Sequence, residues 1–311
     1  MIEHPPDDGT AYPRTMIIES SSRCNFLCPL CLWTHNRHHG YLSAETYARF
    51  IEQAAPFLQR VCFAGRGEPT LNPRLAEILA ISARSGVVTD LATNGSSLIR
   101  DGDALLDTGI DAVNVSIEAD TADDFVRYRI RGDFDSVVEG MRRIALRKRQ
   151  RGLDRPRLRT CSTIFGYNED RLDRLREFFA SLGFEEFIFK SAHLGHGQLE
   201  ESEDSLRERW LPSNPRLRRS QFNEAAGPTA IHCSFLTQAH LLWNGDIGRC
   251  AIDHESMVVG NILEASFDEI WRGPRSLEVA RTVVEGRFPK CASCTFSGRS
   301  RSESGRELYV L

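Results

Sequence analysis

The feature that most limits the possible folds of this chain is a regular alternation of short apolar runs with amphipathic segments. Strands are expected at 14–20, 60–64, 87–92, 112–117, 158–165 and 184–190, and helices at 42–59, 73–85, 101–108, 134–152 and 169–182. Repeated βα units of this kind predict an α/β fold with a parallel sheet, and their number favours an open or closed barrel. In such barrels the catalytic loops follow the C-terminal ends of the strands.

Three cysteines follow the first expected strand directly, with the spacing C-x3-C-x2-C: Cys24, Cys28 and Cys31. Three close thiolates can hold three irons of a [4Fe–4S] cluster, which usually takes four cysteines, so one iron would keep an open position. The alternative is a structural zinc site, whose fourth ligand could be His35, His38 or His39. We favour the cluster, because zinc sites usually use paired cysteines rather than C-x3-C.

This spacing is the signature of the radical S-adenosylmethionine (SAM) superfamily, which the chain resembles over residues 14–300. In that family the open iron binds the methionine part of SAM, and an electron cleaves SAM to a 5′-deoxyadenosyl radical that abstracts hydrogen from a substrate C–H bond. The resemblance implies a partial (β/α)6 TIM-like barrel, a [4Fe–4S] cluster with an open iron site, bound SAM, and an electron donor such as flavodoxin or ferredoxin.

Further motifs resemble the SAM-binding positions of that family and occur in the same order. Gly65-Arg66-Gly67-Glu68-Pro69 is similar to its Gly-Gly-Glu-Pro motif, with Arg66 replacing one glycine, and the acid and nearby carbonyls of that motif hold the SAM amino group. Polar residues at the end of the fourth strand reach the ribose and carboxylate, and the stretch from 162 to 169 resembles Gly-x-Ile-x-Gly-x-x-Glu, whose Ile packs on adenine. The implied SAM-binding residues are Gly67, Glu68, Pro69, Asn94, Ser116, Glu118, Ser162 and Ile164.

Each of these motifs, taken alone, also fits an ordinary tight turn or strand end. One position departs from the family pattern: the residue before the last cluster cysteine is commonly aromatic there, and here it is Leu30. The adenine contact at this position is therefore expected to be weaker, or to come from Trp33.

A second set of cysteines lies near the C-terminus: Cys233, Cys250, Cys291 and Cys294. A hairpin at Asn244-Gly245 would bring the first two together, and the C-x2-C pair would supply two more thiolates. Four thiolates close a ligand shell, so the site is a fully ligated cluster or a structural zinc. The pattern resembles the SPASM/twitch extension of radical SAM enzymes, and this resemblance implies one auxiliary [4Fe–4S] cluster.

We expect four regions: an N-terminal tail (1–13), the barrel (14–195), a charged linker or cover (196–230) and a Cys-rich twitch/SPASM-like domain (231–311). The net charge of −4 gives no electrostatic footprint for nucleic acid. No apolar run reaches membrane-spanning length, and no signal-peptide core is evident. The prediction is a cytoplasmic protein without nucleic-acid or membrane partners, whose nine cysteines are not disulfide-bonded.

The domain plan resembles enzymes of aminoglycoside and carbohydrate pathways, such as 2-deoxy-scyllo-inosamine dehydrogenases and aminoglycoside epimerases. That resemblance implies hydrogen abstraction from a hydroxylated or aminated carbohydrate or aminocyclitol in natural-product (antibiotic) biosynthesis, with oxidation of an alcohol carbon. Ala251 and Ile252 stand where the dehydrogenase has an aromatic residue and an acid near its substrate, which predicts a different substrate. Three alternatives remain: radical epimerisation, peptide modification, for which the segment before the first strand is too short to hold a recognition domain, and a zinc-stabilised binding protein without activity.

Oxidation needs a base, and epimerisation needs a hydrogen donor. The candidate bases are Arg66, Glu118, Lys190 and His193. Cys250 could donate hydrogen if it is not a cluster ligand. Cys62 and Cys161 are first interpreted as small core residues, and Cys161 is expected to face the helices because it alternates with Thr160 and Ser162.

Overall fold

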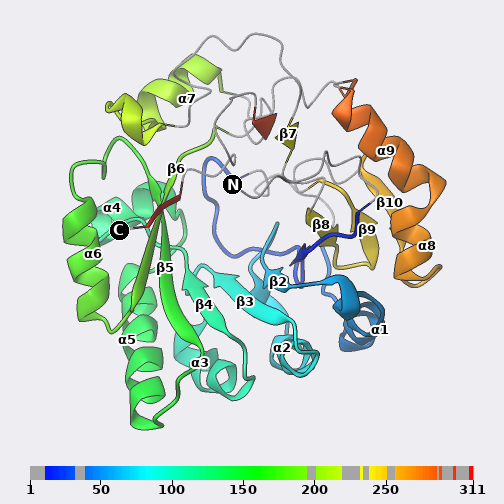
Figure 1. Ribbon diagram of the computed structural model, residues 1–311. Helices are drawn as coiled ribbons and strands as arrows, with labels where there is room; N and C mark the ends of the chain where they lie inside the picture. The colour runs from blue at the N-terminus through cyan, green and yellow to red at the C-terminus, as the bar shows by residue number, and fades with distance from the viewer. Residues whose placement is uncertain are drawn as a thin grey trace, which may run out of the picture.

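The computed structural model describes residues 11–31, 39–194, 201–218, 232–233, 238–250, 256–285, 287–288, 297–298 and 308–310. Its largest element is a 10-stranded sheet with the order β10-β9-β8-β1-β2-β3-β4-β5-β6-β12. The six strands from β1 to β6 are parallel and adjacent in chain order, and helices lie outside them (Figure 1). This arrangement confirms the predicted α/β fold with a parallel, barrel-like sheet.

The barrel elements have the following bounds. The strands are β1 (Thr15–Ile18), β2 (Arg60–Phe63), β3 (Val88–Thr93), β4 (Ala112–Val115), β5 (Arg157–Ile164) and β6 (Glu186–Ser191). The helices are α1 (Ala44–Ala54), α2 (Leu75–Arg84), α3 (Leu98–Asp107), α4 (Ala122–Tyr128), α5 (Phe134–Gln150) and α6 (Leu172–Ser181). All the expected strands and helices are present, with ends that shift by a few residues, and α4 is an additional helix.

Side-chain caps fix where several of these helices begin. The hydroxyl of Ser43 accepts a hydrogen bond from the Thr46 amide at the start of α1, as its sequence position predicted. Asp133 caps α5 in the same way. Because these caps satisfy amides that have no partner within the helix, they hold the loops that connect strand to helix at the C-terminal end of the barrel.

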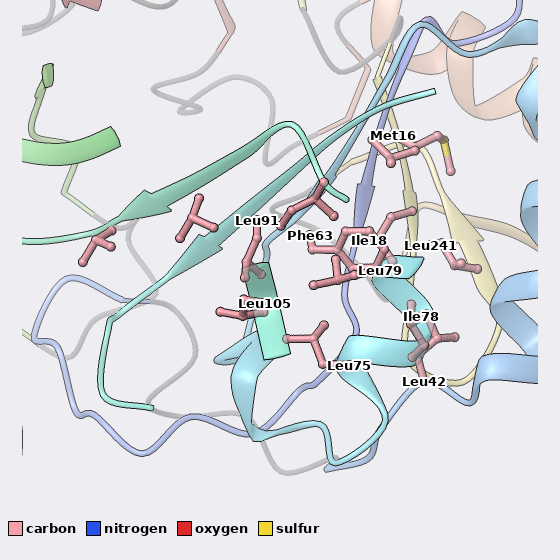
Figure 2. Close-up of a cluster of buried hydrophobic side chains, with 14 of the residues drawn as sticks. Met16, Ile18, Leu42, Phe63, Leu75, Ile78, Leu79, Leu91, Leu105 and Leu241 are labelled. Atoms are coloured by element: carbon pink, nitrogen blue, oxygen red, sulfur yellow. The ribbon is translucent and has the colours of Figure 1, made fainter. Parts of the chain in front are cut away.

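The main hydrophobic core lies between the outer face of the strands and the surrounding helices. Met16 and Ile18 of β1 pack with Phe63 of β2 and with apolar side chains of α2 (Figure 2). Leu241, from the C-terminal part of the chain, packs in the same core. The C-terminal region is therefore joined to the barrel through a shared core rather than through a linker alone.

The inner face of the barrel is polar, and an ion-pair network crosses its N-terminal end. Arg60 pairs with Asp90, Arg159 Nη1 lies 3.9 Å from Asp90 Oδ1, and Arg159 also pairs with Glu186. Cys161 lies on the same strand face as Arg159, because side chains alternate along a strand. The expectation that Cys161 faces the helices is therefore wrong.

Cys62 lies on the inner face too, since it alternates with Val61 and Phe63, which point toward the helices. Cys62 and Cys161 are both half-buried. These two thiols therefore line the barrel interior and are not part of the packed core between sheet and helices.

The C-terminal elements extend the sheet at both edges and add a separate two-stranded sheet of β7 and β11. They are β7 (His232–Cys233), β8 (Gln238–Leu241), β9 (Asp246–Gly248), β10 (Val258–Asn261), α8 (Phe267–Arg272), α9 (Pro274–Val284), β11 (Ser297–Gly298) and β12 (Leu308–Val310). β8 runs parallel to β1, and β12 runs antiparallel to β6. The predicted hairpin at Asn244-Gly245 is confirmed as the turn between β8 and β9, in which Gly245 has φ +92°.

Residues 196–230, expected to be a linker or cover, contain the helix α7 (Glu203–Trp210). Leu206 and Trp210 of α7 are buried in a second hydrophobic cluster with Phe165 and Leu30. This part of the segment is thus a packed cover over the loops that follow β5 and β6. Among the described helices, none has the length and apolar character needed to span a bilayer.

Candidate active site

The first cysteine set forms a loop, residues 23–31, directly after β1; we call it the cysteine loop. Its backbone is held at two places, where Leu27 N donates to Ile130 O at 3.0 Å and Cys31 N donates to Cys28 O at 3.0 Å. Cys24 is exposed, Cys28 is buried and Cys31 is half-buried. The chain thus presents three thiols on one short loop at the C-terminal end of the barrel.

Two polar side chains reach the thiols, one from Asn94 directly after β3 and one from Arg129 at the C-terminal end of α4. Arg129 Nη1 lies 3.7 Å from Cys28 Sγ, and Asn94 Nδ2 lies 4.0 Å from Cys24 Sγ. Burial raises the pKa of the Cys28 thiol to about 12, while the charge of Arg129 opposes this shift. Soft thiol ligands next to a guanidinium and an amide fit an iron–sulfur cluster, because the metal deprotonates the thiols and the donors stabilise the sulfur charge.

The loop after β2 packs directly on the cysteine loop. Gly65 has φ +116°, a conformation that favours glycine. A Cβ atom on Gly67 would lie 2.2 Å from Ser21 O and 2.5 Å from Arg23 O, so only glycine fits there. Glu68 N donates to Arg23 O at 2.7 Å. The Gly-Arg-Gly-Glu-Pro motif therefore supports the cysteine loop through its backbone.

Glu68 is buried, and its carboxylate joins the loops after β2 and β3. Oε1 accepts hydrogen bonds from the amide and hydroxyl of Thr70 and from the Thr93 hydroxyl, and Oε2 accepts one from Asn94 N at 2.6 Å. Burial raises the pKa of Glu68, and these donors oppose the shift. The described contacts are thus internal, and a contact of Glu68 with the SAM amino group stays a prediction.

Glu118, expected at the SAM site or as a base, is buried beside Arg129. Arg129 Nε donates to Glu118 Oε2 at 2.8 Å, and Arg129 Nη2 donates to Glu118 Oε1. Asn168 Nδ2 donates to the Glu118 carbonyl at 3.0 Å. The two hydrogen bonds from Arg129 to Glu118 orient the guanidinium toward Cys28. Arg129 thus connects Glu118 to the cysteine loop.

The other predicted SAM residues lie at the ends of β3, β4 and β5. Asn94 is buried and Ser116 is half-buried, both near the C-terminal end of the inner face. Ser162 donates a hydrogen bond to Ile117 O, and Ile164 is fully buried in the main core. The ribose and adenine contacts of these residues stay predictions.

One buried acid was not singled out from the sequence. Glu19 follows β1 by one residue, is 3% exposed, and lies 3.9 Å from Arg66 Nε through its Oε2 atom. The available signal was an acid closing an otherwise apolar strand just before the cysteine loop. Of the other candidate bases, Lys190 is exposed and His193 is half-buried.

The second cysteine set is described in part. The backbone of Cys233 in β7 pairs antiparallel with Ser297 in β11, which brings the segment after Cys294 to Cys233. Cys250 is half-buried and follows Arg249, whose guanidinium lies 3.8 Å from the ring centroid of Trp271. The side chain of Cys233 and all of Cys291 and Cys294 lie outside the described residues, as do Trp33, His35 and His38.

A pocket of about 350 Å³ lies beside the cysteine loop. It is lined by Pro29, Arg127, Ile130, Tyr167, Arg209 and Trp210. Over the residues that the structure describes, no three Cys, His, Asp or Glu side chains converge as the ligands of a single metal ion would.

Two family models match the chain. A model described as the radical SAM superfamily matches residues 18–182, just over half of the 311 residues, and the SPASM model, an iron–sulfur cluster-binding domain, matches residues 233–295. The PqqA peptide cyclase of Ruegeria pomeroyi is 29% identical over 57% of this chain and 47% of the relative. The GTP 3′,8-cyclase of Paracoccus denitrificans is 28% identical over 68% of this chain and 61% of the relative. The chain thus spans about half the length of the curated relatives that it matches.

Solved structures with a similar fold extend over more of the chain. BtrN in complex with AdoMet and 2-DOIA has a TM-score of 0.55 and 17% identity, over 96% of this chain and 98% of that chain. Streptococcus suis SuiB bound to the precursor peptide SuiA has a TM-score of 0.65 and 16% identity, over 91% of this chain and 70% of that chain. At these identities the likeness establishes the fold.

Proposed function

The chain belongs to the radical SAM superfamily, and from this premise we propose that it oxidises an alcohol carbon of a hydroxylated or aminated carbohydrate or aminocyclitol. The cofactors predicted from the sequence are confirmed: SAM, a [4Fe–4S] cluster that binds it, and an auxiliary cluster in the SPASM domain. The observation that carries the proposal is the end-to-end match in fold with BtrN, whose complex contains 2-DOIA.

The residues of the chain have separate roles in this proposal. Cys24, Cys28 and Cys31 hold the first cluster, and Gly67 lets the loop after β2 pack closely on the backbone of the cysteine loop. When bound, the cluster and SAM supply hydrogen abstraction from carbon. The polar strand ends of the inner face, including Asn94 and Ser116, orient SAM and the substrate.

Cys233, Cys250, Cys291 and Cys294 are the proposed ligands of the auxiliary cluster, which would supply an acceptor for the electron that oxidation releases. Arg249 precedes Cys250 in the chain, and its Nε donates a hydrogen bond to Ser276 Oγ at 2.7 Å. This bond ties the backbone next to Cys250 to α9. A flavodoxin or ferredoxin is the proposed source of the electron that starts each turnover.

Epimerisation is a second candidate because of one observation: Cys62 and Cys161 face the barrel interior, where a thiol could return hydrogen to a substrate carbon. Cys250 is a third candidate donor if it is not a cluster ligand. Replacing each of the three by alanine separates the reactions. A variant that still forms 5′-deoxyadenosine but no product identifies a hydrogen donor, and three unaffected variants exclude epimerisation.

Peptide modification is a third candidate, because the matched relatives include a peptide cyclase and SuiB bound to its precursor peptide. Incubation with a peptide library instead of sugars tests it. Hydrogen abstraction from peptides, with none from polyols, would replace the carbohydrate proposal.

Anaerobic reconstitution followed by SAM cleavage under dithionite is the first experiment. About eight irons per chain, with 5′-deoxyadenosine formed, is the expected result for two [4Fe–4S] clusters. Deuterated aminocyclitols and sugars then locate the abstracted hydrogen in the 5′-deoxyadenosine. About four irons would remove the auxiliary electron acceptor, and zinc in place of iron would overturn the enzyme proposal.

A further inference from the structure

Glu19 occupies the inner face of the barrel at its C-terminal end. It lies on the same side of the chain as Ile17, whose neighbour in β8 is His240. A Cβ atom on Gly65 would lie 3.7 Å from Glu19 Cβ and 3.8 Å from Ile17 Cγ2, so the loop after β2 covers this face. The cysteine loop begins a few residues further along the chain.

The carboxylate of Glu19 is incompletely satisfied. Among the described residues its Oε2 atom has no hydrogen-bond partner, although it is buried, and Arg66 Nε lies 3.9 Å away. Burial raises the pKa of Glu19 to about 7, while the charge of Arg66 and the backbone amides of Trp243 and Arg66 oppose the shift. A buried acceptor of this kind costs free energy unless a ligand completes it.

Glu19 also lies where the two parts of the molecule meet. β1 pairs with β2 of the barrel on one side and with β8 of the C-terminal region on the other, and Glu19 N donates to Leu241 O at 2.8 Å. Cys24 follows in the chain on one side, and the hairpin that leads to Cys250 lies on the other. Glu19 is therefore close in the chain to the cysteine loop and lies beside the strand whose hairpin leads to Cys250.

We propose that Glu19 is the catalytic base that removes the hydroxyl proton of the reacting carbinol, an inference that rests on the proposed function. Hydrogen abstraction breaks the C–H bond, and the O–H bond breaks with its proton passing to Glu19 Oε2. The carbonyl double bond forms as the remaining electron leaves, and the auxiliary [4Fe–4S] cluster, when bound, would supply the acceptor for that electron. SAM is consumed as methionine and 5′-deoxyadenosine.

The other candidate bases fit this step less well. The Arg66 guanidinium stays protonated and cannot accept a proton, so Arg66 is a positioning residue that holds the Glu19 carboxylate. Both oxygens of Glu118 bind Arg129. The titratable groups at this face on the neighbouring elements are Arg66 after β2 and His240 of β8, and the charge of Arg66 lowers the pKa of Glu19.

The first test compares wild type with Glu19→Gln, using the aminocyclitol or sugar, deuterated at its carbinol carbons, from which wild type transfers deuterium to 5′-deoxyadenosine. We expect 5′-deoxyadenosine to form within about threefold of the wild-type rate and to carry deuterium, while the ketone per 5′-deoxyadenosine falls about 100-fold or more. The oxidation rate of wild type should fall below pH 7, because Glu19 becomes protonated. In Arg66→Gln this fall should begin at a higher pH, because the variant lacks the charge that lowers the pKa of Glu19. Equal ketone yield from Glu19→Gln overturns the inference.

A second readout needs neither cofactor nor substrate. Since the folded pKa exceeds the unfolded value, ionisation favours the unfolded chain, and stability falls as pH rises from about 4.5 toward 7. The unfolding constant of wild type relative to Glu19→Gln should rise about 70-fold between pH 5 and pH 8. The matched control, Glu139→Gln at an exposed position, should show no such change.

The two readouts separate the possible failures. If wild type oxidises none of the deuterated aminocyclitols and sugars, the proposed function fails, while the pH dependence still decides whether Glu19 is the buried titrating acid. If wild type oxidises the substrate and the unfolding curves of wild type and Glu19→Gln have the same pH dependence, the base assignment is wrong.

Discussion

Removing Arg129 should destabilise the protein strongly, because it would leave Glu118 charged and buried. Glu118 is 2% exposed and Arg129 13% exposed at the side chain, and two N–H groups of the guanidinium bind the two carboxylate oxygens. Breaking a buried pair by removing one partner costs about 3–5 kcal/mol, whereas replacing both partners by apolar groups is often nearly neutral. Arg129→Met alone should thus lower the free energy of unfolding by about 3–5 kcal/mol. The double variant, Glu118→Leu with Arg129→Met, should lose much less than the sum of the losses in the two single variants.

Anaerobic urea unfolding of the four proteins in this cycle measures the coupling directly. The matched control is Arg142→Met, whose exposed guanidinium lies 4.0 Å from Glu139 and should contribute less than about 1 kcal/mol. If Arg129→Met costs no more than this control, or if the double variant equals the sum of the single ones, the pair does not have the assigned role.

The same substitution has a second consequence at the cysteine loop. Arg129 Nη1 lies 3.7 Å from Cys28 Sγ, and a nearby cation favours the thiolate. Arg129→Met should therefore raise the pKa of Cys28 further and slow iron uptake near neutral pH. Iron incorporation measured at pH 7 should be slower for Arg129→Met than for wild type, and equal rates would contradict this role of the guanidinium.

Three further substitutions test separate parts of the structure. Gly67→Ala places a Cβ atom 2.2 Å from a backbone carbonyl oxygen and should cost about 1–3 kcal/mol and lower cluster content, while Gly102→Ala, with 3.6 Å to its nearest neighbour, should leave the iron count unchanged. Arg249→Met removes the guanidinium that stacks on Trp271 and should reduce iron from about eight to about four per chain without abolishing SAM cleavage. Trp210→Ala should lower the free energy of unfolding, measured in urea, by about 3–5 kcal/mol, because it leaves a cavity in the second hydrophobic cluster.

The order of the barrel elements could be predicted because each strand and helix carries its own periodic pattern. β5 was expected at 158–165 and spans Arg157–Ile164, and the Asn244-Gly245 turn followed from the preference of that dipeptide for hairpins. The cysteine spacing located the metal loop for the same reason, since ligand spacing is a local property. Local signals of this kind need no knowledge of distant contacts.

Non-local pairings could not be predicted in the same way. Nothing in the sequence Gln-Ala-His-Leu at 238–241 indicates that β8 joins β1, and nothing in the sequence of β12 indicates that it joins β6 in the opposite direction. The prediction of the orientation of Cys161 was wrong for a different reason. Thr160, Cys161 and Ser162 are all small and of similar polarity, so no difference in hydrophobicity marks the side that faces the helices. Glu19 was missed because only the packing of β8 and the loop after β2 shows that its carboxyl is buried.

The charged residues on the inner face of the barrel form two groups, one at the N-terminal end of the strands and one at the C-terminal end. We expect the chemistry to take place at the C-terminal end only. At the N-terminal end, Arg60, Asp90, Arg159 and Glu186 neutralise one another across four strands. At the C-terminal end, the charged pairs lie beside the cysteine loop, where Glu19 keeps an unsatisfied oxygen. Replacing the ion-pair network at the N-terminal end by apolar residues should therefore change the stability of the protein. It should not change the ratio of product to 5′-deoxyadenosine, because that ratio depends on groups that reach the substrate.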